Sequence, residues 1–318
     1  MQTPGVITNN IKEYSIIRLS RSSLEDLAKL HSFVYAPVAA DHYVKKYDTA
    51  YTGVEYVGFM AYNNEIPIAY YGVIPCFVQS STEIILAAQS ADTMTHPEFR
   101  FKGMFMELSN KTFELCRQLG IRLVFGFPNQ NSYHGAIKLG WKQTETMECF
   151  MIPVQTFPLK SFFKKNIFFK KLYAGYCDFI LREKRIDLDG VSNSVQKDDF
   201  AGVYRTKEYL RHKKYSNSIV IAIGNAKLWI SYKNDFVIGD MEGITEESFA
   251  AVMKEVRNLT RKLGIRQIQF HTSGGTQLHK LFSTSYKSTP SFPVLFQDFG
   301  SPVALETIKF TFADVDIF

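Results

Sequence analysis

The chain has 318 residues, of which 46% are hydrophobic and 14% aromatic, so it can bury a large core and is long enough for two domains. Its net charge of +6 is modest and no recognition motif accompanies it, which argues against a nucleic-acid partner. The N-terminus has no basic-then-apolar leader, and no run reaches the ~18 apolar residues that a membrane span needs. We therefore expect a cytoplasmic protein without a membrane span.

The four cysteines are far apart and lie in apolar patterns. This distribution is typical of buried free thiols in a reducing compartment, and it fits neither a disulfide framework nor a metal site. We expect no bound metal. The positions are Cys76, Cys116, Cys149 and Cys177.

Residues 84–94 alternate loosely and are rich in small and apolar side chains, which predicts a buried strand. Pro97 ends it, because proline cannot donate to the ladder. From Met104 the apolar residues follow a helical period as far as Gly120, which stands where a C′ glycine belongs. Residues 100–103 are thus expected to form a loop that leads into a helix.

This loop has features of a phosphate site. The free N–H groups and the positive dipole end of a helix N-terminus attract anions. Gly103 lets the backbone approach a ligand closely, and Arg100 and Lys102 add positive charge. An ordinary basic turn would have the same composition, so the loop alone does not decide between them.

A second pattern follows the next expected strand, residues 121–127. It has Asn129 and Ser132 at the start of a further helix, and Gly140 and Trp141 at its end. Asn129 also suits a helix N-cap, and the two roles are compatible.

Together the two patterns resemble the coenzyme A site of the GCN5-related N-acetyltransferases (GNAT). Arg100 and Gly103 match the first and fourth places of the family's Gln/Arg-x-x-Gly-x-Gly/Ala pyrophosphate loop, whereas Phe105 stands where a small residue is usual. Asn129 and Ser132 match the family's second motif, with the correct gap to its Gly-Phe pair. The resemblance covers residues 84–142 specifically and the remainder loosely.

The resemblance implies acetyl-CoA, or another acyl-CoA, as co-substrate and direct transfer of the acyl group to a primary amine of a small molecule or amino sugar. The residues that it assigns to the co-substrate are Thr93, Met94, Thr95, Arg100, Phe101, Lys102, Gly103, Met104, Phe105, Asn129 and Ser132.

A general base is expected near the end of the strand, where Asp92 and His96 are the candidates. Asp92 could instead pair with Arg100, and His96 could be a solvated turn residue. The family's tyrosine, which often protonates the leaving thiolate, would fall at Ala136. Tyr133, about one helical turn earlier, is a possible substitute, although a thiol of pKa about 8.5 can leave unprotonated.

Residues 116–122 recur as residues 260–266, and each copy reads as a helix end, a glycine and a strand start. Such a match indicates a tandem repeat. The same shift places Glu247 opposite Gly103, and an acidic first turn repels a pyrophosphate, so the second copy is expected to have lost the co-substrate.

The predicted fold class is α/β (α+β with mixed sheets): two tandem GNAT-like domains, each a twisted mixed β-sheet flanked by helices. Residues 1–152 are expected to form the domain with the acyl-CoA site and residues 191–318 the degenerate one. Residues 153–190 form a connecting helical segment. Its phenylalanines and lysines, beginning at Phe162 to Lys165, suit either an anionic membrane surface or, as we prefer, an interdomain helix.

Residues 45–48, Lys-Lys-Tyr-Asp, could bind an anionic or sugar-nucleotide acceptor or could be a solvated loop. Three functions remain open: an acyl-CoA-dependent N-acyltransferase, a Fem-type aminoacyltransferase using aminoacyl-tRNA, and a catalytically inactive binding module. The loop before Met104 suits a pyrophosphate and favours the first, while Ala136 and Phe105 raise the third. The expected partner is a small-molecule amine, and the oligomeric state is undetermined.

Overall fold

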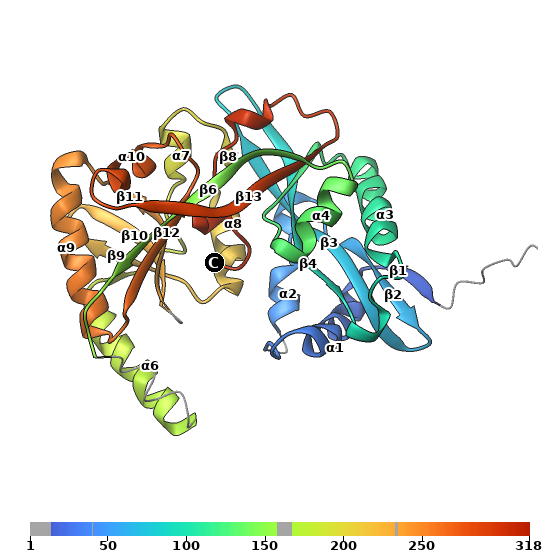
Figure 1. Ribbon diagram of the computed structural model, residues 1–318, viewed down its shortest axis with the longest axis horizontal. Helices are drawn as coiled ribbons and strands as arrows, with labels where there is room; N and C mark the ends of the chain where they lie inside the picture. Colours follow the sequence, from blue (N-terminus) through green and yellow to red (C-terminus); the bar gives the residue numbers. More distant parts are fainter. Residues whose placement is uncertain (1–13, 40, 158–166, 233–234) are drawn as a thin grey trace, which may run out of the picture.

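A computed structural model describes residues 14–39, 41–157, 167–232 and 235–318 (Figure 1). The strands are β1 (Ser15–Arg18), β2 (Val57–Asn63), β3 (Ile66–Gln79), β4 (Ile84–Thr95), β5 (Leu123–Gly126), β6 (Lys142–Pro153), β7 (Arg185–Ile186), β8 (Gly202–Val203), β9 (Ile219–Ile223), β10 (Ala226–Ser231), β11 (Phe236–Glu242), β12 (Gln267–Thr272) and β13 (Ser288–Asp298). The α-helices are α1 (Leu24–Val34), α2 (His42–Lys46), α3 (Met104–Gln118), α4 (Gln130–Lys138), α6 (Ile167–Leu181), α7 (Ser194–Lys197), α8 (Lys207–His212), α9 (Glu246–Lys262) and α10 (Gln277–Ser283).

The described strands form one mixed sheet in the order β1-β2-β3-β4-β5-β13-β6-β12-β11-β10-β9-β7, with β8 attached to β3. The pairs β4–β5 and β11–β12 are parallel and the other strand pairs are antiparallel. Helices flank the sheet along its length (Figure 1). The mixed sheet with flanking helices that the sequence predicts is confirmed.

The same succession of elements occurs twice along the chain. One run is β2-β3-β4-α3-β5-α4-β6 and the other is β9-β10-β11-α9-β12-α10-β13. Their long helices end alike: the N–H of Ile121 donates to the carbonyl of Cys116, as that of Ile265 does to Thr260, at 3.0 and 3.1 Å. This 6→1 bond is typical of a Schellman cap, and it explains why residues 116–122 and 260–266 share a sequence pattern.

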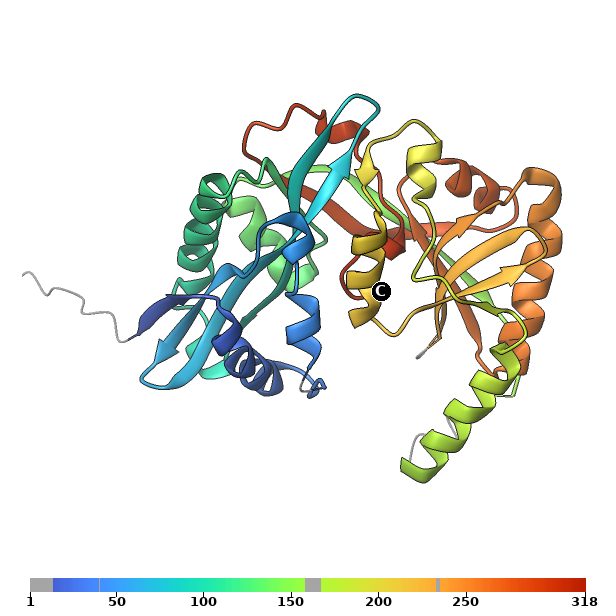
Figure 2. The same ribbon diagram turned by 180° about the vertical axis from the view of Figure 1, so that it is seen from behind.

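The last strand of each run pairs with the other run. β13 lies beside β5, with Leu295 opposite Gly126, and β6 lies beside β12, with Phe150 opposite Phe270. β6 and β13 also pair with each other, so two long strands cross between the halves (Figures 1 and 2). Each half therefore completes the sheet of the other.

The sheet of the first half is covered on both faces. Tyr71 and Val73 of β3 pack in the apolar cluster under α3, whereas Tyr70 and Ile74 pack in the cluster under α1. This division follows from the strand repeat, in which successive side chains point to opposite faces. A ligand that passes between strands here would therefore reach from the α3 face to the α1 face.

Helix α6 packs one side on the second half, where Cys177 and Leu181 are buried and the hydroxyl of Tyr173 donates to the carbonyl of Leu263 at 2.8 Å. Its other side exposes Leu172 and Phe179. The predicted Phe162–Lys165 stretch lies outside the described residues.

All four cysteines are buried thiols. Within the described ranges, no helix has the length and apolar character to cross a membrane.

Candidate active site

A bulge in β4 begins the site. Gly72 of β3 pairs with Ala91 and Tyr70 with Met94, so Asp92 and Thr93 together oppose one residue. Asp92 has a φ of +53°, in the left-handed region. An extra residue of this kind bends the strand and re-aims its side chains.

Beyond the bulge, β4 and its parallel neighbour separate. They pair from Ala87 opposite Leu123 to Gln89 opposite Phe125, after which β4 continues to Thr95 while β5 ends at Gly126. A cavity of about 880 Å³ opens at this divergence. Residues from both faces of the sheet line it, including Tyr71 from the α3 side and His31 from the α1 side.

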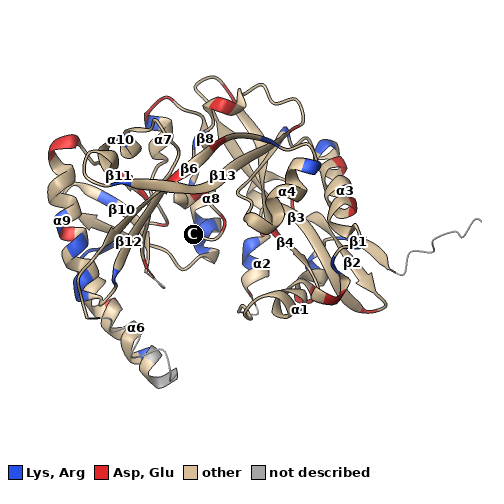
Figure 3. Cartoon of the chain, viewed as in Figure 1, with Lys and Arg blue, Asp and Glu red and all other residues tan. Residues whose placement is uncertain are grey.

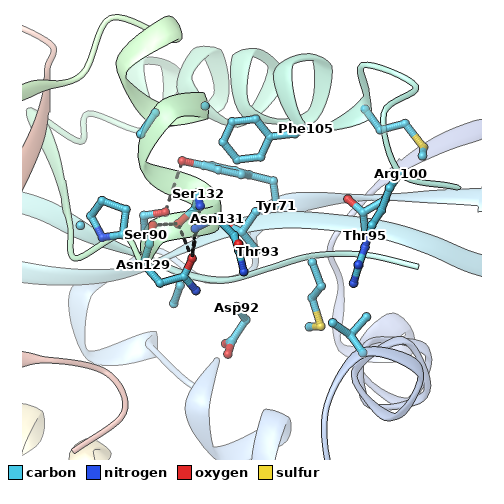
Figure 4. Close-up of a pocket in the computed structure, with 18 of the residues that line it drawn as sticks. Tyr71, Ser90, Asp92, Thr93, Thr95, Arg100, Phe105, Asn129, Asn131 and Ser132 are labelled. Carbon is cyan, nitrogen blue, oxygen red and sulfur yellow. Dashed lines mark hydrogen bonds between the residues drawn. The ribbon is translucent and has the colours of Figure 1, made fainter. Parts of the chain in front are cut away.

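The structure brings the predicted co-substrate residues together in the wall of this cavity (Figure 4). They come from the end of β4, from the loop before α3, from the first turn of α3 and from the start of α4. They are Thr93, Met94, Thr95, Arg100, Phe101, Lys102, Gly103, Met104, Phe105, Asn129 and Ser132.

The loop before α3 has the geometry of an anion cradle. Phe101 and Gly103 have positive φ values of 64° and 78°, and the first helical bond runs from the N–H of Glu107 to the carbonyl of Gly103. The preceding amides have no partner within the helix, and Arg100 and Lys102 are exposed beside them. The sequence expectation of a basic loop at a helix N-terminus is confirmed.

Asn129 is the N-cap of α4. Its Oδ1 accepts from the N–H of Asn131 at 2.9 Å and of Ser132 at 3.2 Å. The prediction that Asn129 is a helix N-cap is thus confirmed, and its contact with a co-substrate stays a prediction.

Phe105 departs from the family pattern without closing the cavity. Its ring packs edge-on against Tyr71, with ring centroids 5.8 Å apart. It also lies over α4 at Gly135, where a Cβ atom would meet Cε1 of Phe105 at 2.7 Å. The bulky residue on α3 is accommodated because the facing position on α4 has no side chain.

Of the three predicted catalytic residues, Asp92 lines the cavity. Its Oδ1 accepts from Nζ of Lys46 at 2.8 Å and its Oδ2 from the hydroxyl of Tyr47 at 3.0 Å. Lys46 and Tyr47 are both buried, so this part of the 45–48 segment is neither a solvated loop nor free to bind an anion.

His96 and Tyr133 are absent from the cavity wall. Nδ1 of His96 accepts from the N–H of Glu98, and its ring contacts Phe33. The hydroxyl of Tyr133 donates to Oε1 of Gln143 at 2.7 Å. Both side chains therefore have structural partners away from the cavity.

Several polar residues that sequence reasoning did not assign also line the cavity, among them Tyr71 and Asp316. The hydroxyl of Tyr71 accepts from Oγ of Ser90 at 3.2 Å, and burial raises its pKa (Figure 4). Asp316, near the C-terminus, accepts from Nζ of Lys46 at 2.9 Å. No spacing rule links these residues to the motifs, since they come from a neighbouring strand and from the far end of the chain.

The equivalent place in the second half is filled by the chain itself. β11 pairs with β12 from Phe236 opposite Ile268 to Ile238 opposite Phe270, and the 3₁₀ turn Phe312–Asp314 packs beyond this point. There Arg205 lies between Asp240 and Asp314, at 2.6 and 2.8 Å, with all three buried.

Helix α9 also begins differently from α3. Its first turn carries Glu246 and Glu247 and its last turn carries basic residues, a polarity visible in Figure 3. Thr245 caps the helix with its own side chain, accepting from the N–H of Ser248 at 3.3 Å. Capping by Thr245 and the two carboxylates together leave a poor site for a phosphate. Among the described residues, no group of His, Cys, Asp and Glu has the arrangement of a metal site.

The family model of the acetyltransferase (GNAT) domain matches residues 15–144. No curated protein sequence matches the chain. Among solved structures, the GCN5-related N-acetyltransferase from Kribbella flavida has a TM-score of 0.58 at 11% identity, over 93% of this chain and 73% of its own. That from Anabaena variabilis has a TM-score of 0.56 at 14% identity, over 90% and 73%.

N-myristoyltransferase from Saccharomyces cerevisiae, solved with bound myristoyl-CoA, has a TM-score of 0.55 at 11% identity, over 90% of this chain and 82% of its own. At these identities the structural matches show the fold, and the family model covers most of the residues that line the cavity. The family model therefore identifies residues 15–144 as an acetyltransferase (GNAT) domain.

Proposed function

We propose that this chain is an acyl-CoA-dependent N-acyltransferase that transfers an acyl group, in the simplest case acetyl, to a primary amine. The observation that carries the proposal is the cavity between β4 and β5, which ends at the basic N-terminus of α3. A GNAT domain with this cavity intact has the elements needed to bind the donor. The closely packed Phe105 and Gly135 argue against an inactive module, because the family's small residue has been replaced without loss of the cavity.

In this proposal the pyrophosphate of the donor binds the amides of residues 101–104, assisted by Arg100 and Lys102. The pantetheine arm runs along the edge of β4 that β5 leaves unpaired, at Thr93 to Thr95, toward the start of α4. A backbone amide of this edge polarises the thioester carbonyl. The acyl carbon is thereby held at the divergence of the strands.

The reaction is a direct transfer. The neutral amine attacks the thioester carbonyl carbon, a C–N bond forms and the C–S bond breaks. The thiolate of coenzyme A takes a proton from the hydroxyl of Tyr71, which recovers one from the nitrogen as the amide forms. A tyrosine hydroxyl, with an ordinary pKa of about 10, is protonated at neutral pH as a general acid must be, and burial raises the pKa of Tyr71 further.

We further propose that residues 1–152 and 191–318 are tandem GNAT-like domains joined by residues 153–190, with one working co-substrate site. The repeated succession of elements supports this division, and the exchange of β6 and β13 ties the two domains together. Two features support the loss of the co-substrate site in the second domain. The turn Phe312–Asp314 fills the space beside β11, and the first turn of α9 is acidic.

The test is calorimetry with acetyl-CoA on the full chain. We expect one site per chain, abolished by Gly103→Glu, because a carboxylate then stands in the anion cradle. Gly120→Glu is the matched control: both glycines have φ +78° and open space around the Cβ position, but Gly120 lies at the other end of α3. Two sites, or equal losses in both variants, would contradict the assignment. Binding of an aminoacyl-tRNA in place of acetyl-CoA would instead favour a Fem-type enzyme.

A further inference from the structure

The two ends of the cavity carry opposite charge. Arg100 and Lys102 lie in its wall next to α3, whereas the carboxylates of Asp92 and Asp316 lie between β4 and the C-terminal segment. Within the described residues no other lysine or arginine lines it. Figure 4 shows Asp92 on the opposite side of β4 from Phe105. An anionic donor and a cationic acceptor are thus attracted to opposite ends of one cavity.

The positive charge that balances the two carboxylates is buried behind them. Lys46 is 3% exposed, donates to both Asp92 and Asp316, and does not line the cavity. The neighbouring Lys213, also buried, donates at 2.7 Å to the carbonyl of Val315 and to neither carboxylate. A ligand in the cavity therefore meets carboxylate oxygens rather than ammonium groups.

Asp316 keeps one oxygen available. The amide of Gln89 is satisfied when its nitrogen donates to the carbonyl of Asp314 at 3.1 Å and its oxygen accepts from the N–H of Asp316 at 3.0 Å. The opposite orientation gives only a 3.4 Å contact to Oδ1 of Asp316. In the satisfied orientation, Oδ2 accepts from Lys46 while Oδ1 accepts from no described residue. Such an oxygen in a cavity wall is a suitable partner for an ammonium group.

Two buried polar atoms at this end also lack a hydrogen-bond partner among the described residues. One is Nδ1 of His31, which lines the cavity, and the other is the hydroxyl of Tyr43, whose ring lies 5.9 Å from that of His31. Buried polar groups are rarely left unpaired, so these two atoms make the acceptor end of the cavity more polar than its side chains alone suggest.

The rest of this wall is apolar. Val34 and Tyr35 at the end of α1 and Ile317 of the C-terminal segment line it. Tyr35 is 51% exposed and Ile317 66%. They can cover the apolar body of a ligand whose nitrogen lies against the carboxylates.

Resting on the proposed function, we propose that the acceptor is a primary ammonium with an apolar or aromatic body, and that Asp316 binds its nitrogen and accepts its proton. The C-terminal segment then supplies a catalytic residue to the site in the GNAT domain. A carboxylate or phosphate next to the amine would be repelled by Asp92 and Asp316.

The reaction needs no further reactant to take up or supply protons. The ammonium group gives one proton to Oδ1 of Asp316, which releases it to solvent. The neutral amine then attacks the thioester carbon, and its second proton reaches the sulfur as the C–S bond breaks. The products are the N-acyl amine, free coenzyme A and one proton.

The experiment compares 2-phenylethylamine with L-phenylalanine, which carries one additional carboxylate, using acetyl-CoA as donor and released thiol as readout. We expect kcat/KM to be at least ~10-fold higher for phenylethylamine, because two carboxylates line the acceptor end. Acetylation of phenylalanine at an equal rate, or of neither amine, would overturn the acceptor class.

The residue is tested with Asp316→Asn. We expect kcat/KM for phenylethylamine to fall by ~10²-fold or more, and its fall toward acidic pH to disappear, while calorimetry shows an unchanged Kd for acetyl-CoA. Asp316→Glu should recover part of the activity, and the exposed Glu306→Gln should behave like the wild type. An unchanged pH profile in Asp316→Asn would refute the proton-accepting role.

These outcomes separate the two proposals. A wild-type chain that binds no acetyl-CoA contradicts the proposed function itself. A chain that binds acetyl-CoA but does not distinguish the amines contradicts only the acceptor class. If Asp316→Asn does not fold, the comparison of the two amines with the wild-type chain still tests the acceptor class. The change in kcat/KM of Asp316→Glu then tests the role of the residue.

Discussion

The ring of Phe105 on α3 occupies the space that a side chain at Gly135 on α4 would need, with a Cβ-to-Cε1 separation of only 2.7 Å. Ring packing of Phe105 against Tyr71 limits its freedom to move aside. These two helices start on either side of the cavity, so this contact sets their spacing.

Gly135→Ala should therefore destabilise the protein, although alanine in a helix is normally favoured over glycine by up to ~1 kcal/mol. In a Phe105→Ala background the clash is gone, and the same change should stabilise by roughly that amount. Urea unfolding of the four chains in this double-mutant cycle provides the measurement. Equal effects of Gly135→Ala in both backgrounds would show that the two positions are not coupled.

Tyr71→Phe should lower kcat by roughly 10²-fold or more with little change in the Kd of acetyl-CoA, because it removes the proposed proton donor. Tyr133→Phe is the matched control: its hydroxyl donates to Gln143 outside the cavity wall, so kcat should stay near the wild-type value. Steady-state kinetics and calorimetry measure both variants. A larger loss of kcat in Tyr133→Phe than in Tyr71→Phe would instead identify Tyr133 as the proton donor.

Lys46→Met should cost up to roughly 3–5 kcal/mol of unfolding free energy at pH 7, because it leaves the half-buried carboxylates of Asp92 and Asp316 without their shared cation. Burial opposes the charge of Lys46, but Asp316 and Asp92 outweigh it and raise its pKa above the ordinary value.

In the variant the two carboxylates face each other with no cation between them. Adding Asp316→Asn should recover part of the stability. Urea unfolding at pH 7 tests both expectations, and an equal loss in the single and the double variant would exclude this carboxylate pair as its cause.

His271 should make stability sensitive to acid. Burial lowers its pKa from 6.5 to about 4, between Oγ of Ser291 at 2.6 Å and Sγ of Cys149 at 3.4 Å. Between pH 6.5 and 4, His271 is protonated in the unfolded chain but neutral in the folded one. The contribution of His271 to the unfolding free energy is therefore fully present above pH 6.5 and is lost as pH is lowered toward 4. His271→Gln should reduce that slope by up to ~1.4 kcal/mol per pH unit. Parallel denaturation profiles for variant and wild type would contradict this.

The elements around residues 84–142 were predictable because local rules determine them. A proline stops a strand, a glycine in the left-handed region ends α3, and Asn129 caps α4. The co-substrate residues were found for the same reason, since they lie within a few residues of those boundaries.

The acceptor end was not predictable from such rules. Lys46, Asp92 and Asp316 come from three distant segments, and only the folded sheet brings Nζ of Lys46 within 3 Å of both carboxylates. The β4 bulge at Asp92 lies within an otherwise regular strand pattern, so the sequence gives no boundary at this point. His96 and Tyr133 were chosen by sequence spacing, and their side chains found partners elsewhere.

The exchange of β6 and β13 has a consequence for biosynthesis. Until β13 emerges, β5 has an uncovered edge on that side, and Leu295, which lines the cavity, is missing. A ribosome-bound N-terminal portion therefore cannot close its sheet, and an open strand edge favours aggregation. The pairing joins segments about 170 residues apart, so it should form late. We expect stalled or prematurely terminated chains to depend on chaperones, because the cavity is completed only when nearly the whole chain has been synthesised.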